Sequence, residues 1–207
     1  RHTCENGLRI VTEKIPSVRS VALGIWVGTG SKYETKQDNG ISHFLEHMFF
    51  KGTTSRSAKE IAETFDEIGG NVNAFTSKEY TCYYARVLDQ HAPIALDVLA
   101  DMYFHSVFDE EELEKEKNVV IEEISMYEDT PDDLVHDLIA RASFADHPLG
   151  SPILGTEEVL RALKRDDLIN YIERRYLPTN TVVTVAGNFD DSLIEEIKRR
   201  FSAFQRH

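Results

Sequence analysis

The chain has 207 residues, of which 41% are hydrophobic and 29% charged, a composition typical of a globular protein with a sizeable core. Its formal net charge of −13 argues against binding to nucleic acid or to anionic membrane surfaces. The charge is compatible with a basic partner or substrate, and ordinary solubility explains it about as well. No apolar run approaches the roughly 18 residues that a membrane span needs, so neither nucleic acid nor a membrane is an expected partner.

The first third of the chain alternates between strand and helix patterns. A hairpin-like start, TCENGLRIVTE, carries the turn signal Asn6-Gly7 and precedes a strongly strand-like stretch within 17–31. Both faces of that stretch are apolar, which predicts a central strand; the residues are Val21, Leu23, Ile25 and Val27 on one face and Ala22, Gly24 and Trp26 on the other. A helix is expected at 41–50, and a second follows after the capping box of Ser57 and Glu60 and stops at Gly69-Gly70.

The remaining elements complete a mixed pattern. Two antiparallel strands, NVNAFTS and YTCYYARV, flank a short SKE turn. Helices are expected at 91–106, 109–128, 132–144, 156–163, 166–175 and 191–204, with one buried strand, TVVTVAGNF, before the last helix. Most of the strands can pair antiparallel, so the predicted fold class is α+β, with a mainly antiparallel sheet flanked by helices in a single domain spanning 1–207.

The two cysteines, Cys4 and Cys82, both lie in strand-like stretches and form no CxxC motif. This pattern favours a reduced intracellular protein with two buried thiols, and the alternative is a disulfide between neighbouring strands. We expect a cytoplasmic location, with the mitochondrial matrix as the alternative.

The stretch ISHFLEHMFFKGT, residues 41–53, combines many apolar residues with a polar trio. Residues three and four apart share a helix face, so His43, Glu46 and His47 lie together. The two imidazoles, of His43 and His47, can therefore bind the same metal ion. The order HxxEH reverses the HExxH motif of zinc peptidases, and it leaves Glu46 beside the site to take a proton from a metal-bound water. The alternative is a buried cluster of hydrogen-bonded histidine and glutamate without metal.

A catalytic zinc usually has three protein ligands, so a third ligand is needed. The acidic helix at 109–128 is the obvious source, and most of its glutamates should form a solvated face. Its apolar stripe is predicted to comprise Val119, Val120, Ile124 and Tyr127. Glu116 and Glu123 fall on or beside this stripe and Glu112 is a weaker third candidate; periodicity does not choose among them.

With these residues in place, the sequence resembles the pitrilysin, insulinase and mitochondrial processing peptidase family of zinc peptidases, in particular its bacterial processing-protease-like members. The resemblance covers nearly the whole chain and is carried by GISHFLEHMFFKGT, GGNVNAFTSKEYTCYYARV, VVIEEISMYEDTPDD and HPLGSPILGT. It implies one zinc ion held by His43, His47 and Glu123, with Glu46 as catalytic base. It also implies that Glu116 is the auxiliary glutamate of the site.

The resemblance further implies a peptide substrate that pairs with an edge strand. Asn73, Ala74 and Phe75 would bind that substrate through strand addition, and an ordinary hairpin strand is the alternative. HPLGSPILG is expected to be structural, with His147 not a ligand, and the other histidines, His91, His105 and His136, are expected at the surface or at helix ends.

Family members usually carry two homologous halves that close like a clamshell, and this chain resembles the zinc-bearing first half. The expected partners are therefore a homologous second half or a partner subunit, in a homo- or heterodimer. The predicted function is that of a zinc metalloendopeptidase acting on peptides or presequence-like segments. The alternatives are a zinc- and peptide-binding half that is inactive without its partner half, and a non-catalytic core or scaffold subunit.

Overall fold

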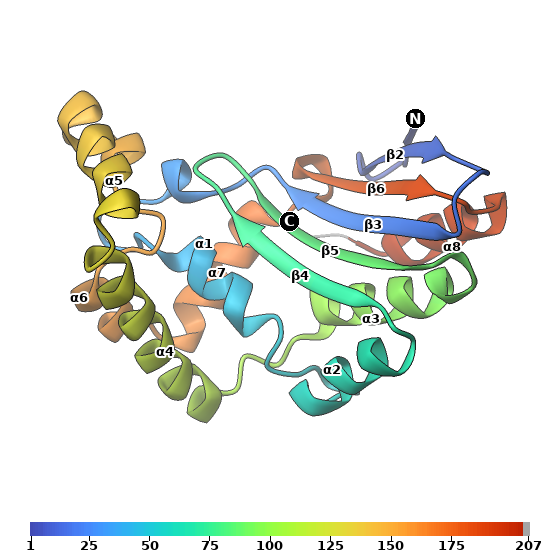
Figure 1. Cartoon of the computed structure of the whole chain (residues 1–207), viewed down its shortest axis with the longest axis horizontal. Helices are drawn as coiled ribbons and strands as arrows, with labels where there is room; N and C mark the ends of the chain where they lie inside the picture. Colours follow the sequence, from blue (N-terminus) through green and yellow to red (C-terminus); the bar gives the residue numbers. More distant parts are fainter. Residues whose placement is uncertain (205–207) are drawn as a thin grey trace.

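A six-stranded sheet, with strand order β1-β2-β6-β3-β5-β4, forms one layer of the molecule (Figure 1). The computed structural model describes residues 1–204. The strands are β1 (His2–Thr3), β2 (Arg9–Lys14), β3 (Ser20–Val27), β4 (Asn71–Thr76), β5 (Thr81–Leu88) and β6 (Thr181–Gly187). Neighbouring strands pair antiparallel except β2 and β6, which are parallel. The predicted α+β class with a mainly antiparallel sheet is confirmed.

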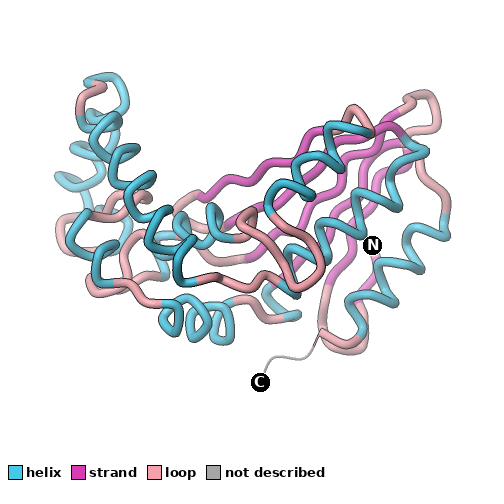
Figure 2. The backbone as a smooth tube through the Cα atoms, turned by 90° about the horizontal axis from the view of Figure 1, so that it is seen from below, coloured by secondary structure: helices cyan, strands magenta, loops and turns pink. Residues whose placement is uncertain are grey.

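Helices cover one face of this sheet, as the view from below shows (Figure 2). In the described residues the α-helices are α1 (Ile41–Met48), α2 (Ala58–Glu67), α3 (Ala92–His105), α4 (Glu110–Glu128), α5 (Pro131–Phe144), α6 (Glu157–Ala162), α7 (Arg165–Arg175) and α8 (Asp191–Ser202), and not all of them lie over the sheet. α4, α5 and α6 lie beyond one end of the sheet, and α1 lies between them and the strands (Figure 1). α1 contacts both β4 and α4, so it joins the two parts of the fold.

The strand β3 is central, as predicted, because β6 and β5 pair with its two sides. Its four core-facing residues, Val21, Leu23, Ile25 and Val27, are buried. The opposite face is less covered than its apolar composition suggests: Ala22 is exposed and Trp26 is half-buried. Within residues 1–204, helices pack on one face of the sheet only, and the other face therefore remains open around Trp26.

Two details of the sequence-based prediction were wrong. Val119 was assigned to the buried stripe of α4 but is 50% exposed, because the buried stripe of that helix comprises Leu113, Glu116, Lys117 and Val120. The second detail is the burial of Cys4, which is half-buried, whereas Cys82 is buried as predicted; both are free thiols, as expected, and the alternative of a disulfide between them does not hold.

Candidate metal centre

The apolar residues of α1 fix the helix in the core and leave its polar trio on the face toward α4. Phe44, Leu45 and Met48 are fully buried in the hydrophobic core. His43 is 7% exposed, and Glu46 and His47 are half-buried on the remaining face. The hydrophobic packing of one face therefore determines where the other face presents its imidazoles.

The N-terminus of α1 is held by a buried carboxylate from outside the helix. Glu34 accepts hydrogen bonds from the backbone N–H of Gly40 at 2.8 Å and of Ser42 at 2.9 Å, which are two of the N–H groups that a helix start leaves without intrahelical partners. Burial raises the pKa of Glu34, and these hydrogen bonds oppose that rise. The hydroxyl of Ser42 also lies 2.9 Å from the buried hydroxyl of Tyr171.

Three predicted ligands converge between α1 and α4. Oε1 of Glu123 lies 3.7 Å from Nε2 of His43, and its Oε2 lies 3.5 Å from Nε2 of His47. One ligand atom from each residue falls within 4.8 Å of the others, and Glu123 is half-buried rather than free in solvent. Two imidazoles and one carboxylate with this spacing fit a catalytic zinc site, which takes three protein ligands and keeps a fourth position for water.

Glu116 lies behind this cluster rather than in it. Its Oε1 lies 2.8 Å from Nδ1 of His47, and its Oε2 lies 2.5 Å from Nζ of Lys51. A carboxylate on Nδ1 favours the tautomer that donates there and leaves the lone pair of Nε2 directed at Glu123. Periodicity left Glu112, Glu116 and Glu123 open as the third ligand. The structure places Glu123 in the cluster and Glu116 behind it, whereas Glu112 pairs with Lys115.

The two imidazoles experience opposite electrostatic environments. Burial, assisted by the charge of His47, lowers the pKa of His43 to about 4, so this ring is neutral at pH 7. For His47, burial acts to lower the pKa, but the hydrogen bond and the charge of Glu116 outweigh it and raise the pKa. His43 is therefore ready to bind a cation, whereas the protonated form of His47 is favoured by Glu116 and must lose its Nε2 proton before that nitrogen can bind a metal.

Glu46 occupies a separate position on the same helix face. Its Oε2 accepts a hydrogen bond of 2.7 Å from the hydroxyl of Thr76, the last residue of β4. Burial raises the pKa of Glu46, while Thr76 and His47 act in the opposite direction. A partly buried carboxylate with a raised pKa, close to a candidate metal site, has the properties of a general base.

Thr76 and Lys51 were not identified from the sequence. Thr76 follows directly on the stretch that was singled out, and Lys51 lies four residues after His47 within ISHFLEHMFFKGT. Because α1 ends at Met48, Lys51 lies beyond the helix, and helical spacing does not place it beside Glu116. Nothing in the sequence links Thr76 to Glu46, because strand residues meet helices only through the tertiary fold.

The strand β4 forms one edge of the sheet and pairs only with β5 among the described strands. Side chains alternate along a strand: Ala74 is buried, whereas Asn73 is exposed and Phe75 packs its ring against Trp26 on the open face. Asn73 therefore lies on the opposite face from Thr76, and it is Thr76 that reaches the helix of the histidines. The edge itself offers backbone groups for strand addition, and substrate contact by Asn73, Ala74 and Phe75 stays a prediction.

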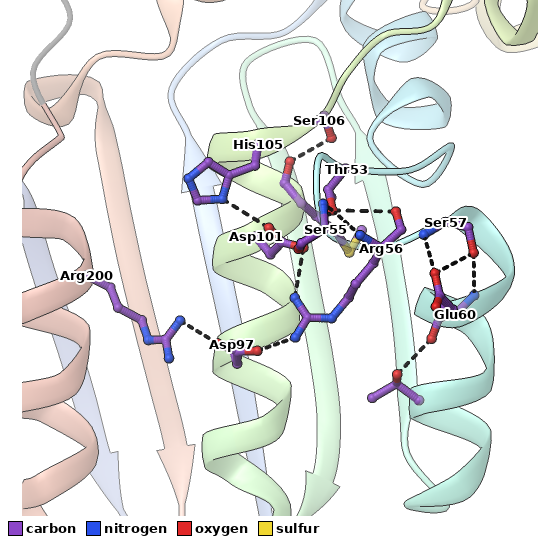
Figure 3. Close-up of polar contacts among 12 residues, drawn as sticks. Thr53, Ser55, Arg56, Ser57, Glu60, Asp97, Asp101, His105, Ser106 and Arg200 are labelled. Atoms are coloured by element: carbon purple, nitrogen blue, oxygen red, sulfur yellow. Dashed lines mark hydrogen bonds and ion pairs between the residues drawn. The ribbon is translucent and has the colours of Figure 1, made fainter.

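The segment after α1 is attached to α3 by a compact polar network (Figure 3). Asp101, which is 8% exposed, lies at its centre and accepts hydrogen bonds from Thr53 at 2.7 Å and from Arg56 at 2.8 Å. Arg56 also pairs with Asp97, which in turn binds Arg200 of α8 at 2.6 Å. Burial raises the pKa of Asp101, but the hydrogen bonds outweigh burial and hold the pKa below its usual value.

The remaining histidines agree with their expected structural positions. Nδ1 of His147 accepts the backbone N–H of Leu149 and so caps a short 3-10 helix. His105 ends α3 and lies 3.0 Å from Asp101, and His136 is exposed on α5. Among the described residues, His43, His47 and Glu123 form the one group of three such side chains close enough to hold a metal ion.

The profile of one protein family, described as insulinase (peptidase family M16), matches residues 9–157. This match covers more than half of the chain and includes the whole candidate metal centre. The chain belongs to the insulinase (M16) family. The resemblance inferred from the motifs is thus confirmed, together with the fold that it implied.

Curated relatives of this M16 chain carry names of zinc proteases. A protein named uncharacterized zinc protease YmxG, from Bacillus subtilis, is 63% identical over 99% of this chain and 50% of its own length. An uncharacterized zinc protease of Streptomyces coelicolor is 48% identical over 97% of this chain and 44% of its own length. The chain spans about half the length of the curated relatives that it matches.

Solved structures share the fold. A protease from Helicobacter pylori aligns over 99% of this chain and 50% of its own, with a TM-score of 0.92 at 24% identity. An M16 inactive domain from Pseudomonas fluorescens aligns with a TM-score of 0.89 at 17% identity, also over 50% of its length. The same fold therefore also occurs in a domain described as inactive. In the part of the chain described by the structure, no helix is both long and apolar enough to cross a bilayer.

Proposed function

We propose that this chain is the zinc-bearing half of a metalloendopeptidase, in which His43, His47 and Glu123 hold one zinc ion and Glu46 is the catalytic base. The observation that carries the proposal is the convergence of these three ligand atoms within 4.8 Å, beside a partly buried glutamate on the same helix. The names of the curated relatives support zinc as the metal. A domain of 1–207 with this role fits the half-length matches to those relatives.

The chemistry divides between the metal and the side chains around it. Zinc in such a site supplies Lewis acidity, which activates water and polarises a carbonyl group. Glu46, held by Thr76, would accept the proton of the attacking water and later donate it to the leaving amine. Glu116 would keep His47 in the tautomer that turns Nε2 toward Glu123.

We further propose that the substrate is an extended peptide that adds to the free edge of β4. Backbone hydrogen bonds along Asn73, Ala74 and Phe75 would supply affinity, as in other cases of strand addition. Because Thr76 ends the same strand and binds Glu46, a peptide in this register would pass close to the base. The net charge of −13 is consistent with basic segments, as in presequence-like substrates.

A second candidate function is favoured by the half-length matches: a zinc- and peptide-binding half that cleaves nothing until a homologous second half closes over it. The solved M16 inactive domain has the same fold, which makes a non-catalytic core or scaffold subunit a third candidate. The intact set of His43, Glu46, His47 and Glu123 argues for catalysis over a scaffold.

Peptide cleavage by the wild-type chain and by Glu46→Gln, each with and without the second half of a full-length relative, separates these functions. Catalysis as proposed predicts cleavage by the wild type, with or without the second half, and its loss by several orders of magnitude in Glu46→Gln while zinc stays bound. Cleavage that appears only when the second half is added selects the second candidate. Cleavage that survives Glu46→Gln would show that Glu46 is not the base.

A further inference from the structure

We propose that Lys51 is a positioning residue of the zinc site, which acts through Glu116 to hold Nε2 of His47 toward the metal. This inference rests on the function proposed above and assigns a role to a residue just beyond the HxxEH motif. Lys51 follows α1, and its backbone N–H donates to the carbonyl of Met48, so its position is fixed by the end of the helix that carries both histidines.

The geometry gives each oxygen of Glu116 one partner. Oε2 binds Nζ of Lys51 at 2.5 Å, and Oε1 binds Nδ1 of His47 at 2.8 Å. The carboxylate therefore bridges the ammonium group and the imidazole. Both partners come from the segment 47–51, whereas Glu116 itself comes from α4, so the bridge also joins the two elements that supply the ligands.

Burial explains why this bridge needs a cation. The side chain of Glu116 is only 6% exposed, and an ionised carboxylate in such a place is costly without a charged partner. When Nε2 of His47 binds a metal, the imidazole at Nδ1 is a neutral donor and no longer supplies a charge of its own. Lys51 is then the one remaining side-chain cation in ion-pair contact with Glu116, as judged from residues 1–204.

The consequence of losing Lys51 follows from the same contacts. Oε2 would remain buried with no donor, and the carboxylate would turn toward solvent to find one. That rotation would weaken the hydrogen bond that Nδ1 of His47 donates to Oε1 and release the imidazole from its fixed orientation. Partners that orient a ligating histidine typically change metal affinity by about 10- to 100-fold when they are removed.

The test is the dissociation constant for zinc, measured by competition with a chromophoric chelator at fixed pH. Four proteins are compared: wild type, Lys51→Met, Lys51→Arg and Lys59→Met. Lys59 is a matched control because it is an exposed lysine on α2 that pairs with Glu63, at a side-chain exposure of 81%. We expect Lys51→Met to weaken zinc binding by about 10- to 100-fold, Lys51→Arg to restore it to within about threefold, and Lys59→Met to leave it unchanged.

A double-mutant cycle with Glu116→Gln keeps the inference testable even where Lys51→Met alone folds poorly. If Lys51 acts through Glu116, Lys51→Met adds no further loss of zinc affinity in the Glu116→Gln background. A further loss of zinc affinity when Lys51→Met is added to Glu116→Gln, or wild-type affinity in Lys51→Met, would overturn the role of Lys51 while leaving the zinc site in place. A wild-type chain that binds no zinc would instead overturn the proposed function and this inference with it.

Discussion

Thr76 and Glu46 are joined by a hydrogen bond of 2.7 Å, so the edge strand of the sheet meets the helix of the histidines at the proposed catalytic base. This contact connects the two parts of the proposed reaction, peptide binding along β4 and proton transfer at Glu46. The hydrogen bond from Thr76 acts to lower the pKa of Glu46, whereas burial raises it. A side chain at the end of the proposed binding strand thus contributes to the protonation state of the base.

Replacing Thr76 by valine should therefore reduce catalysis without removing the metal. The isosteric change removes the donor to Glu46, and kcat/KM should fall by about tenfold, the value of one hydrogen bond to a charged group. Because the ionised form of Glu46 loses this support, its pKa should rise further and the acid limb of the pH–rate profile should move to higher pH. Thr76→Ser retains the hydroxyl and should behave like the wild type; an unchanged profile in Thr76→Val would contradict the assignment.

The metal-free protein should lose stability in acid because of His43. The unfolded state binds a proton at this residue below its ordinary pKa of 6.5, whereas the folded state resists protonation down to about 4. Acid therefore favours the unfolded state across this window, and the loss of stability from pH 7 to pH 5 is about 2 kcal/mol. Urea denaturation at pH 7 and pH 5 in the presence of EDTA measures it.

His43→Gln should lack this part of the pH dependence, whereas His136→Gln, at an exposed position on α5, should retain it. Since each variant is compared with the wild type, the opposing contribution of His47 cancels. The same pH dependence in His43→Gln and in the wild type would show that His43 is not held in its neutral form.

Gly40, which precedes α1, should tolerate no side chain. Its φ is +97°, and a Cβ there would lie 2.6 Å from the carbonyl oxygen of Leu154. Gly69 is a matched control, since its φ of +61° is also positive but a Cβ there would meet nothing within 4 Å. Chemical denaturation should show a loss of about 1 kcal/mol for Gly69→Ala and about 3 kcal/mol for Gly40→Ala. Equal losses would mean that contact with the 147–155 loop does not constrain the start of α1.

Asp101→Asn tests the network that fixes the segment after α1. Loss of the charge opposite Arg56 should lower the free energy of unfolding by about 3 kcal/mol at pH 7. The depressed pKa of Asp101 means that its contribution is present above the ordinary pKa and is lost as the pH falls through the folded-state pKa. The difference between variant and wild type should therefore shrink toward pH 3, and Asp66→Asn, at an exposed position on α2, should show no comparable effect.

The parts of the site that sequence could predict are those within one helical turn. The spacing of His43, Glu46 and His47 placed them on one face of a helix, and the structure has this arrangement. For α4, periodicity selected Glu116 and Glu123 as inward residues but could not rank them. Their roles differ because Glu116 contacts Nδ1 of His47 and Glu123 lies near Nε2. The packing of α1 against α4 determines these contacts.

The features that the sequence did not predict depend on which other parts of the fold pack against a helix or strand. Val119 has the apolar character of a core residue but is exposed because α4 presents a different stripe to its neighbours. α5 is a helix as predicted, although none of its residues is buried. The contact of Thr76 with Glu46 joins residues 30 positions apart, and no local pattern encodes it.

The central claim is that His43, His47 and Glu123 form a zinc site, and the zinc content of purified protein after dialysis tests it most directly. Elemental analysis should find one zinc per chain in the wild type and in Glu122→Gln, which changes an exposed neighbour on the same helix. Glu123→Gln should retain a small fraction of that zinc, because two imidazoles alone hold the ion weakly. Zinc that is absent from the wild type, or equally abundant in Glu123→Gln, would contradict the account.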